Sequence, residues 1–201
     1  SGFFCNHIID LPPNHNPHQV DTFLQFLPAL GKPAELGSPV GFNTPSIESI
    51  EPGLKANAPI LLLPHSRGKE KEWPHFRELT HRILQELPGQ TVVWDSHIPI
   101  PSEDLENQDG FFNTTGKTSI PEMICLVKVA KMVVANDTGP MHIAAALAKP
   151  MIALFGPTKI EKYGAYPLDS QRNANIQSTT SDWSDVSVKR VLAEVFRMTR
   201  M

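Results

Sequence analysis

The sequence predicts an α/β protein with a Rossmann-like parallel β-sheet that carries helices on both faces. From Pro59 onwards, short apolar runs alternate with amphipathic helical patterns, which is typical of βαβ units. The chain has 201 residues, 40% hydrophobic and 19% charged, which suffices for a globular fold with a buried core. No internal repeat or low-complexity tract interrupts this pattern.

The individual elements follow from the same pattern. The runs predicted as strands are residues 58–64, 90–96, 131–137 and 150–156. The segments predicted as helices are residues 74–87, 119–130, 140–148 and 186–198. Pro74 is expected in the first turn of the first helix, and Ser119 and Glu122 form a capping box at the start of the second.

Residues 1–58 differ from the rest of the chain. They are rich in proline and turn residues, with one short helical pattern over 20–31 that ends at Gly31. We therefore predict a boundary between residues 58 and 59. The chain begins at Ser1 rather than at a methionine, so we expect natural sequence upstream.

Composition and spacing exclude several classes of function. A net charge of -3 and a pI near 6.2 give no electrostatic basis for nucleic-acid binding. Cys5 and Cys125 form no CxxC pair, which favours a reduced, cytoplasmic protein. The histidines lack metal-ligand spacing, and no apolar run approaches the roughly 18 residues of a membrane span. Five residues separate Gly110 from Gly116, one more than a phosphate-binding P-loop has.

The sequence Asp137-Thr138-Gly139 follows a predicted strand and precedes an alanine-rich helix. Aspartic proteases carry this triplet twice in an all-β protein, whereas here one copy lies in an α/β pattern. The protease interpretation is therefore disfavoured. A phosphate would be repelled by Asp137, so we expect that carboxylate to fix the turn through backbone amides or to accept a sugar hydroxyl.

The same turn fits an anion-binding helix start. Gly139 is expected to relax the backbone, and Pro140 presets the first helical φ angle. The amides of Met141 and His142 would then lack intrahelical acceptors and lie at the positive end of the helix dipole. Thr138 and His142 would add side-chain donors. From spacing alone, an ordinary capped helix explains these residues equally well.

A basic loop after the first strand is the second candidate phosphate site. Ser66, Arg67, Gly68, Lys69 and Lys71 concentrate donors and positive charge at the carboxyl end of a strand. A solvated basic turn is the alternative, because two glutamates in the loop offset much of the charge.

Residues 115–158 resemble glycosyltransferase family 9, the heptosyltransferases. The resemblance rests on "TGKTS", on Asp137-Thr138-Gly139 with His142, on the alanine-rich helix and on "LFGPT". The loop "PHSRGKEKEWP" is similar to the family's basic loop, with Lys71 and Trp73 in place. The strand end "VVWDSHIP" departs from the family's more glycine-rich turn.

The resemblance implies one half of a GT-B fold. Residues 1–58 would be a remnant of the N-terminal acceptor domain plus the interdomain connector, and residues 59–201 the Rossmann-like donor-binding domain. The implied reaction transfers heptose from an ADP-heptose-like donor to a lipopolysaccharide core or lipid A-linked acceptor, without metal or cofactor. The general base would come from the acceptor domain, so no catalytic residue is assigned and this chain alone is expected to be inactive.

The resemblance also implies the site residues. The residues that would meet the diphosphate and sugar of the donor are Ser66, Arg67, Gly68 and Lys71, together with the turn at 137–142, that is Asp137, Thr138, Gly139, Pro140, Met141 and His142. Trp94, Asp95 and Thr118 would border the nucleoside. The protein would be cytoplasmic, and a peripheral contact with the inner membrane stays open. A GT-B transferase that uses another nucleotide-sugar, or a non-catalytic nucleotide-binding module, stays open.

Overall fold

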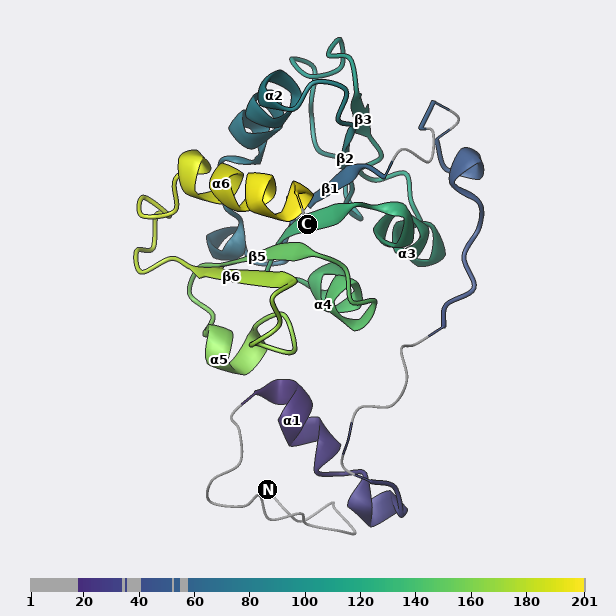
Figure 1. Ribbon diagram of the computed structural model, residues 1–201, viewed down its shortest axis with the longest axis vertical. Helices are drawn as coiled ribbons and strands as arrows, with labels where there is room; N and C mark the ends of the chain where they lie inside the picture. The colour runs from purple at the N-terminus through teal and green to yellow at the C-terminus, as the bar shows by residue number, and fades with distance from the viewer. Residues whose placement is uncertain (1–17, 34, 36–40, 52, 55–57, 201) are drawn as a thin grey trace.

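The computed structural model describes residues 18–33, 35, 41–51, 53–54 and 58–200 (Figure 1). Cys5 and much of the segment predicted as a domain remnant lie outside these residues. The described chain folds around one six-stranded sheet. Its strands are β1 (Ile60–Leu63), β2 (Val92–Trp94), β3 (Phe111–Asn113), β4 (Met132–Asn136), β5 (Met151–Phe155) and β6 (Asn173–Gln177).

All neighbouring strands pair in parallel, in the order β3-β2-β1-β4-β5-β6. The predicted Rossmann-like parallel sheet is therefore confirmed, and its strand order is that of dinucleotide-binding folds. The sequence patterns identified β1, β2, β4 and β5 but missed the two edge strands. The reason is physical: each of these strands pairs on one side only, and most of its side chains are half-buried.

Helices cover both faces of the sheet, as expected (Figure 1). Against one face pack α2 (Phe76–Glu86) and α6 (Val188–Thr199), and against the other pack α3 (Ile120–Val129) and α4 (Gly139–Ala146). The strands supply both cores, since Leu62 and Val134 face α2 and α6 while Leu61 and Val133 face α3 and α4. Among the described helices, none has both the length and the apolar character required to cross a bilayer.

Helix boundaries match the patterns closely. The capping box at α3 is present, with the Ser119 amide donating to Glu122 Oε2 at 2.7 Å. Helix α2 begins at Phe76, so Pro74 lies before the helix rather than in its first turn. The remaining helical turns are α1 (Gln19–Leu24), η2 (Pro28–Leu30), η3 (Ile47–Ser49), η4 (Lys69–Lys71) and α5 (Ile160–Tyr163).

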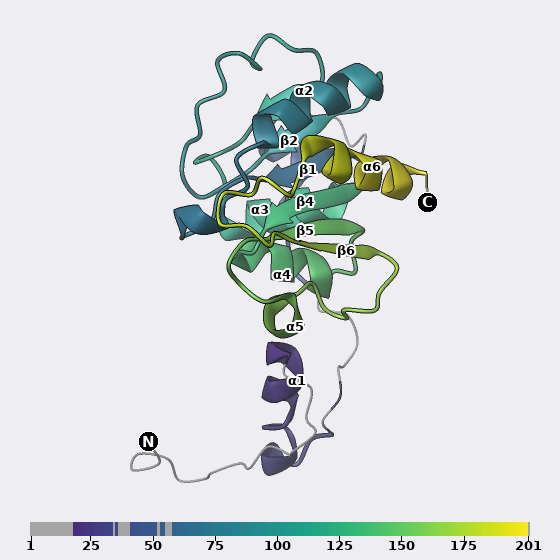
Figure 2. The same cartoon turned by 90° about the vertical axis from the view of Figure 1, so that its left-hand side faces the viewer.

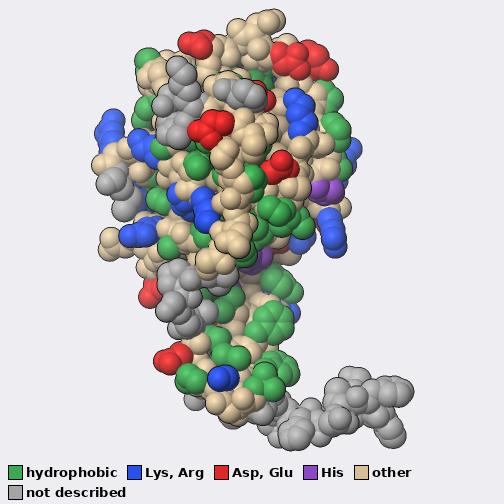
Figure 3. Space-filling model, turned by 90° about the vertical axis from the view of Figure 1, so that its right-hand side faces the viewer, with side chains coloured by type: hydrophobic (Ala, Val, Ile, Leu, Met, Phe, Trp, Pro, Cys, Tyr) green, Lys and Arg blue, Asp and Glu red, His purple; other side chains and the backbone are tan. Residues whose placement is uncertain are grey.

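The N-terminal helical segment meets the sheet domain beside α5 (Figure 2). The Tyr166 hydroxyl donates to Asp21 Oδ1 at 2.7 Å, and the His18 imidazole lies 3.0 Å from the Gly164 carbonyl oxygen. Hydrophobic side chains gather on this projecting segment (Figure 3), where Phe23 and Leu30 are strongly exposed. Farther along, Ile47 and Leu54 are buried in the core beneath α3, so part of the segment before residue 58 packs on the sheet domain.

Candidate functional site

A cavity of about 840 Å³ lies at the carboxyl ends of the strands. The chain crosses from β1 to one side of the sheet and later returns to β4 on the other, so a crevice forms between these two strand ends. Its walls come from the loop after β1, the turn after β2 and the starts of α3 and α4. All the predicted site side chains line it except Met141 and Trp94.

Lys71 and Asp137 form the central ion pair of the cavity. Lys71 Nζ donates to Asp137 Oδ2 at 2.8 Å, and the Thr158 hydroxyl donates to the same oxygen at 2.7 Å. The Asp137 side chain is 8% exposed and that of Lys71 is 30% exposed. Among the described residues, no backbone amide donates to the Asp137 carboxylate, so Asp137 holds Lys71 rather than the turn amides.

Asn136, which the sequence interpretation overlooked, fixes the basic loop. This buried residue donates from Nδ2 to the Pro64 carbonyl at 2.8 Å and accepts from the Trp73 amide at 3.0 Å. One side chain thus closes both ends of the loop 64–73. A signal was available, because an asparagine that ends a fully buried strand requires hydrogen-bond partners.

The start of α4 offers free backbone donors, though not those expected. The Met141 amide donates to the Thr138 carbonyl at 3.1 Å, and the Met141 side chain is fully buried in the core. The prediction is therefore wrong for the Met141 amide. Among the described residues, the amides of Thr138 and Gly139 have no acceptor, so they are the donors available to a ligand.

Gly139 has a different role from the expected one. Its φ angle lies outside the left-handed region, and a Cβ built there would meet no protein atom within 4 Å. The turn therefore does not require glycine for backbone relaxation. Gly139 instead leaves open space at the cavity wall beside its own amide.

His142 presents its imidazole to the cavity. Loss of solvation between the surrounding walls lowers its pKa, an effect that Asp137 opposes and that His18 and Lys71 reinforce. The ring is therefore mostly neutral at pH 7, so one of its nitrogens can donate a hydrogen bond and the other can accept one.

The remaining residues of the basic loop differ in their exposure. The Ser66 hydroxyl is buried and donates to the Asp137 carbonyl at 3.1 Å, so it braces the turn. The Ser66 amide donates to Glu72 Oε1 at 3.0 Å, and that oxygen also lies 2.7 Å from His65 Nδ1. Arg67 is exposed at the cavity mouth, and Gly68 lines it. One of the two loop glutamates is thus bound within the loop.

Asp95 and Thr118 form the other half of the cavity. Asp95 is buried, and its Oδ1 accepts from the hydroxyls of Thr118 at 2.7 Å and Thr114 at 3.0 Å. Burial raises the pKa of Asp95 above its ordinary value, and the hydroxyl donors oppose that shift.

Trp94 does not contribute to this half. Its indole is buried in the core beneath α2, where Nε1 donates to the Thr80 hydroxyl at 2.8 Å. Successive strand residues point to opposite faces, so Trp94 at the end of β2 turns away from the cavity. The expectation that Trp94 borders a nucleoside is therefore wrong.

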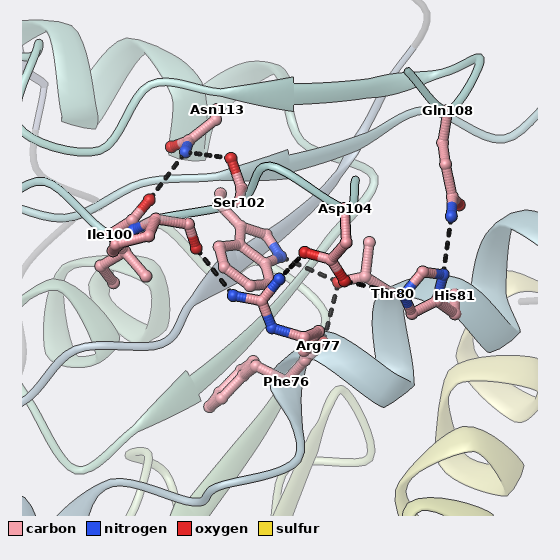
Figure 4. Close-up of polar contacts among 11 residues, drawn as sticks. Phe76, Arg77, Thr80, His81, Ile100, Ser102, Asp104, Gln108 and Asn113 are labelled. Carbon is pink, nitrogen blue, oxygen red and sulfur yellow. Dashed lines mark hydrogen bonds and ion pairs between the residues drawn. The ribbon is translucent and has the colours of Figure 1, made fainter. Parts of the chain in front are cut away.

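The loop between β2 and β3 is fastened to α2 (Figure 4). Asn113 Nδ2 donates to the Ile100 carbonyl at 2.9 Å and to Ser102 Oγ at 2.7 Å. Arg77 and Asp104 form an ion pair across the loop, with about half of each side chain exposed. Among the residues that the structure describes, no group of three or more His, Cys, Asp or Glu side chains could hold a metal ion.

Comparisons with a family model, with curated proteins and with solved structures point to the same family. Residues 3–192 match the model of glycosyltransferase family 9 (heptosyltransferase). Lipopolysaccharide heptosyltransferase 2 of Escherichia coli K12 is 33% identical over 100 residues, which is 45% of this chain and 28% of that protein. Among solved structures, E. coli ADP-heptose lps heptosyltransferase II superposes with a TM-score of 0.67 at 24% identity, covering 94% of this chain and 64% of that one.

A second solved relative, E. coli heptosyltransferase WaaC with ADP, superposes with a TM-score of 0.63 at 21% identity. It covers 87% of this chain and 54% of that chain. The chain thus spans less than two thirds of the length of each of these relatives. At such identities the superpositions show that the fold is shared.

Proposed function

The chain belongs to glycosyltransferase family 9, and on that premise we propose that its cavity binds the nucleoside diphosphate of an ADP-heptose-like donor. Heptose would pass from this donor to a lipopolysaccharide core acceptor. One observation carries the proposal. The cavity at the ends of β1 and β4, where the chain changes direction across the sheet, brings together Lys71, His142 and the free amides of Thr138 and Gly139.

The two ends of the cavity suit the two parts of a nucleotide. Lys71 supplies a fixed positive charge, and the helix start supplies two amides, as a diphosphate requires. Beyond them, Asp95 can accept a ribose hydroxyl, and Met123 and Ile143 offer an apolar wall for a base. The names of the relatives, which include ADP and ADP-heptose, favour adenine.

These groups also suit the transfer step. As the bond from sugar to diphosphate breaks, negative charge accumulates on the leaving ADP. A cation and oriented dipoles that are already in place stabilise that charge without having to rearrange. We assign no general base to this chain. We further propose that donor binding needs no metal ion and that the protein works at the cytoplasmic face of the inner membrane.

The decisive variant is Lys71→Ala, measured by isothermal titration with ADP. Loss of a charge-assisted contact, which leaves Asp137 unneutralised beside the diphosphate, should weaken ADP binding about 100-fold. Lys69→Ala is the matched control, because Lys69 lies exposed on the same turn η4 and outside the cavity wall. Equal affinity in Lys71→Ala and wild type, or no binding of millimolar ADP by wild type, would refute the proposal.

Parallel titrations with UDP and GDP test the choice of base, and a titration with EDTA present tests the proposed metal independence. ADP should bind at least about tenfold more tightly than the other nucleotides if the apolar wall is specific for adenine. Equal affinities would mean that the wall does not select adenine, and tighter binding of UDP or GDP would point to a donor with that base.

Gly139→Ala tests the helix start separately. The added methyl group meets no protein atom, so the melting temperature should stay within a degree or two of wild type. It would occupy the space in which a phosphate approaches the free amides, so ADP binding should fall by about tenfold. Unchanged ADP affinity would remove the start of α4 from the binding site.

A further inference from the structure

Thr158 lies in the loop between β5 and α5 and outside the cavity wall, yet it contacts the central ion pair. Its hydroxyl donates to Asp137 Oδ2 at 2.7 Å, the same oxygen that Lys71 Nζ reaches at 2.8 Å. Among the described residues, Oδ1 of this carboxylate receives no hydrogen bond. Thr158 and Lys71 are thus joined through one atom.

Asp137 is held from several directions at once. Its amide donates to the Leu154 carbonyl at 3.1 Å, and its carbonyl accepts from Ser66 Oγ at 3.1 Å. These bonds fix the backbone but leave the side-chain torsions free. The bond from Thr158 is therefore the contact, apart from Lys71 itself, that sets the carboxylate rotamer.

The loop that carries Thr158 lies in close contact with the turn that carries Lys71. A Cβ built on Gly156 would lie 2.7 Å from the carbonyl oxygen of Glu70 and 2.8 Å from the Trp183 ring. The two backbones therefore touch at a point where only glycine fits. This contact holds the loop of Thr158 against η4, so the hydroxyl stays within reach of the ion pair of Lys71 and Asp137.

A lysine side chain has four rotatable bonds and loses considerable rotamer freedom when it is fixed. On the basis of the function proposed above, we infer that Thr158 is a positioning residue. It orients the Asp137 carboxylate, and through it holds the Lys71 ammonium ready for the donor diphosphate. By donating to Oδ2, it also disperses the negative charge that would otherwise repel the diphosphate.

The experiment compares variants that remove or keep the hydroxyl. Thr158→Val and Thr158→Ala remove it, and Thr158→Ser keeps it. Thr179→Val is the matched control, since Thr179 also donates its hydroxyl to an aspartate, Asp185 at 2.8 Å, away from the cavity. Each protein is titrated with ADP, and the ε-methylene protons of Lys71 are observed by NMR in ¹³C-lysine-labelled protein, assigned with Lys71→Arg.

In wild type, a fixed Lys71 should show two distinct ε-proton shifts. In Thr158→Val and Thr158→Ala these shifts should merge, and ADP binding should weaken about tenfold, while Thr158→Ser and Thr179→Val stay within about twofold of wild type. Distinct ε-proton shifts in both hydroxyl-free variants would overturn the inference, as would equal losses in Thr158→Ser. Failure of wild type to bind ADP would refute the proposed function, while the Lys71 spectra would still decide the role of Thr158.

Discussion

The two halves of the cavity have neighbouring loops that are held by the same kind of contact, but the contacts differ in burial. The diphosphate half comprises Lys71, Asp137, Thr138, Gly139 and His142, and it lies at the ends of the central strands β1 and β4. The nucleoside half comprises Asp95, Thr118 and Met123, beside β2 and the start of α3. In each half, the asparagine that ends a strand fastens the neighbouring loop.

The two asparagines differ in burial. Asn136 at the end of β4 is fully buried, and one side chain closes both ends of the loop 64–73. Asn113 at the end of the edge strand β3 is half-buried and holds only the middle of the loop between β2 and β3. The rest of that loop is held to α2 by contacts that are partly exposed, namely the ion pair of Arg77 with Asp104 and the hydrogen bond between Gln108 and His81 at 2.7 Å. The loop at the phosphate end is therefore fastened through a fully buried side chain, and the loop at the base end by contacts that are partly exposed.

Replacing the two asparagines should give the largest difference between the halves. Asn136→Ala leaves a buried amide and a buried carbonyl without partners, which should lower the free energy of unfolding by about 3 kcal/mol. Asn113→Ala removes a half-buried side chain, whose place water can take, and should cost about 1 kcal/mol. Urea unfolding followed by tryptophan fluorescence measures both. Equal losses of unfolding free energy in the two variants would mean that the burial of each asparagine does not decide how firmly its loop is held.

A change in the nucleoside half should separate the two parts of the ligand. Asp95→Asn keeps the shape of the side chain but replaces one acceptor oxygen with a donor, so ADP binding should weaken about tenfold. Binding of inorganic pyrophosphate, which lacks the nucleoside, should stay within about twofold of wild type. Isothermal titration with both ligands gives the comparison, with Lys71→Ala as the variant that loses both. If Asp95→Asn weakened pyrophosphate as well, Asp95 would belong to the diphosphate half.

The sequence patterns predicted more of the fold than of the site's internal bonding. Buried strands such as β1 and β4 carry continuous apolar runs, and α6 carries a clear apolar face, so these elements were identified. The edge strand β6 is half-solvated and has no such run. The pattern of apolar residues in a strand reflects its burial, and it is weaker in an edge strand, which has no neighbouring strand on one side.

Errors at single residues have a related cause. Trp94 and Asp95 are adjacent, and only the pleat of β2 decides which of them faces the cavity. Asn136 and Thr158 act through partners far away along the chain, so no local spacing marks them. Lys71 and Asp137 were identified because loops at the carboxyl ends of parallel strands meet regardless of their separation in sequence.

The smallest predicted effect concerns the charge on His142 in the diphosphate half. In the free protein, loss of solvation holds its pKa below the ordinary 6.5. As pH falls, the unfolded chain therefore takes up this proton before the folded protein does. The stabilising contribution of the neutral ring is present above pH 6.5 and is lost as pH falls through the lowered pKa. His142→Gln should show a correspondingly weaker loss of stability in acid.

Bound ADP should reverse this shift, because negative charge beside the imidazole favours its protonated form. Binding should therefore take up a fraction of a proton near pH 6.5, and affinity should rise about threefold between pH 8 and pH 6. Isothermal titration in two buffers of different ionisation enthalpy counts the protons. His142→Gln should lose the uptake, while His75→Gln, outside the cavity wall, should keep it. The phosphate groups of ADP titrate in the same way with all three proteins, so they do not affect the comparison. Equal proton uptake in His142→Gln and wild type would place the diphosphate away from His142.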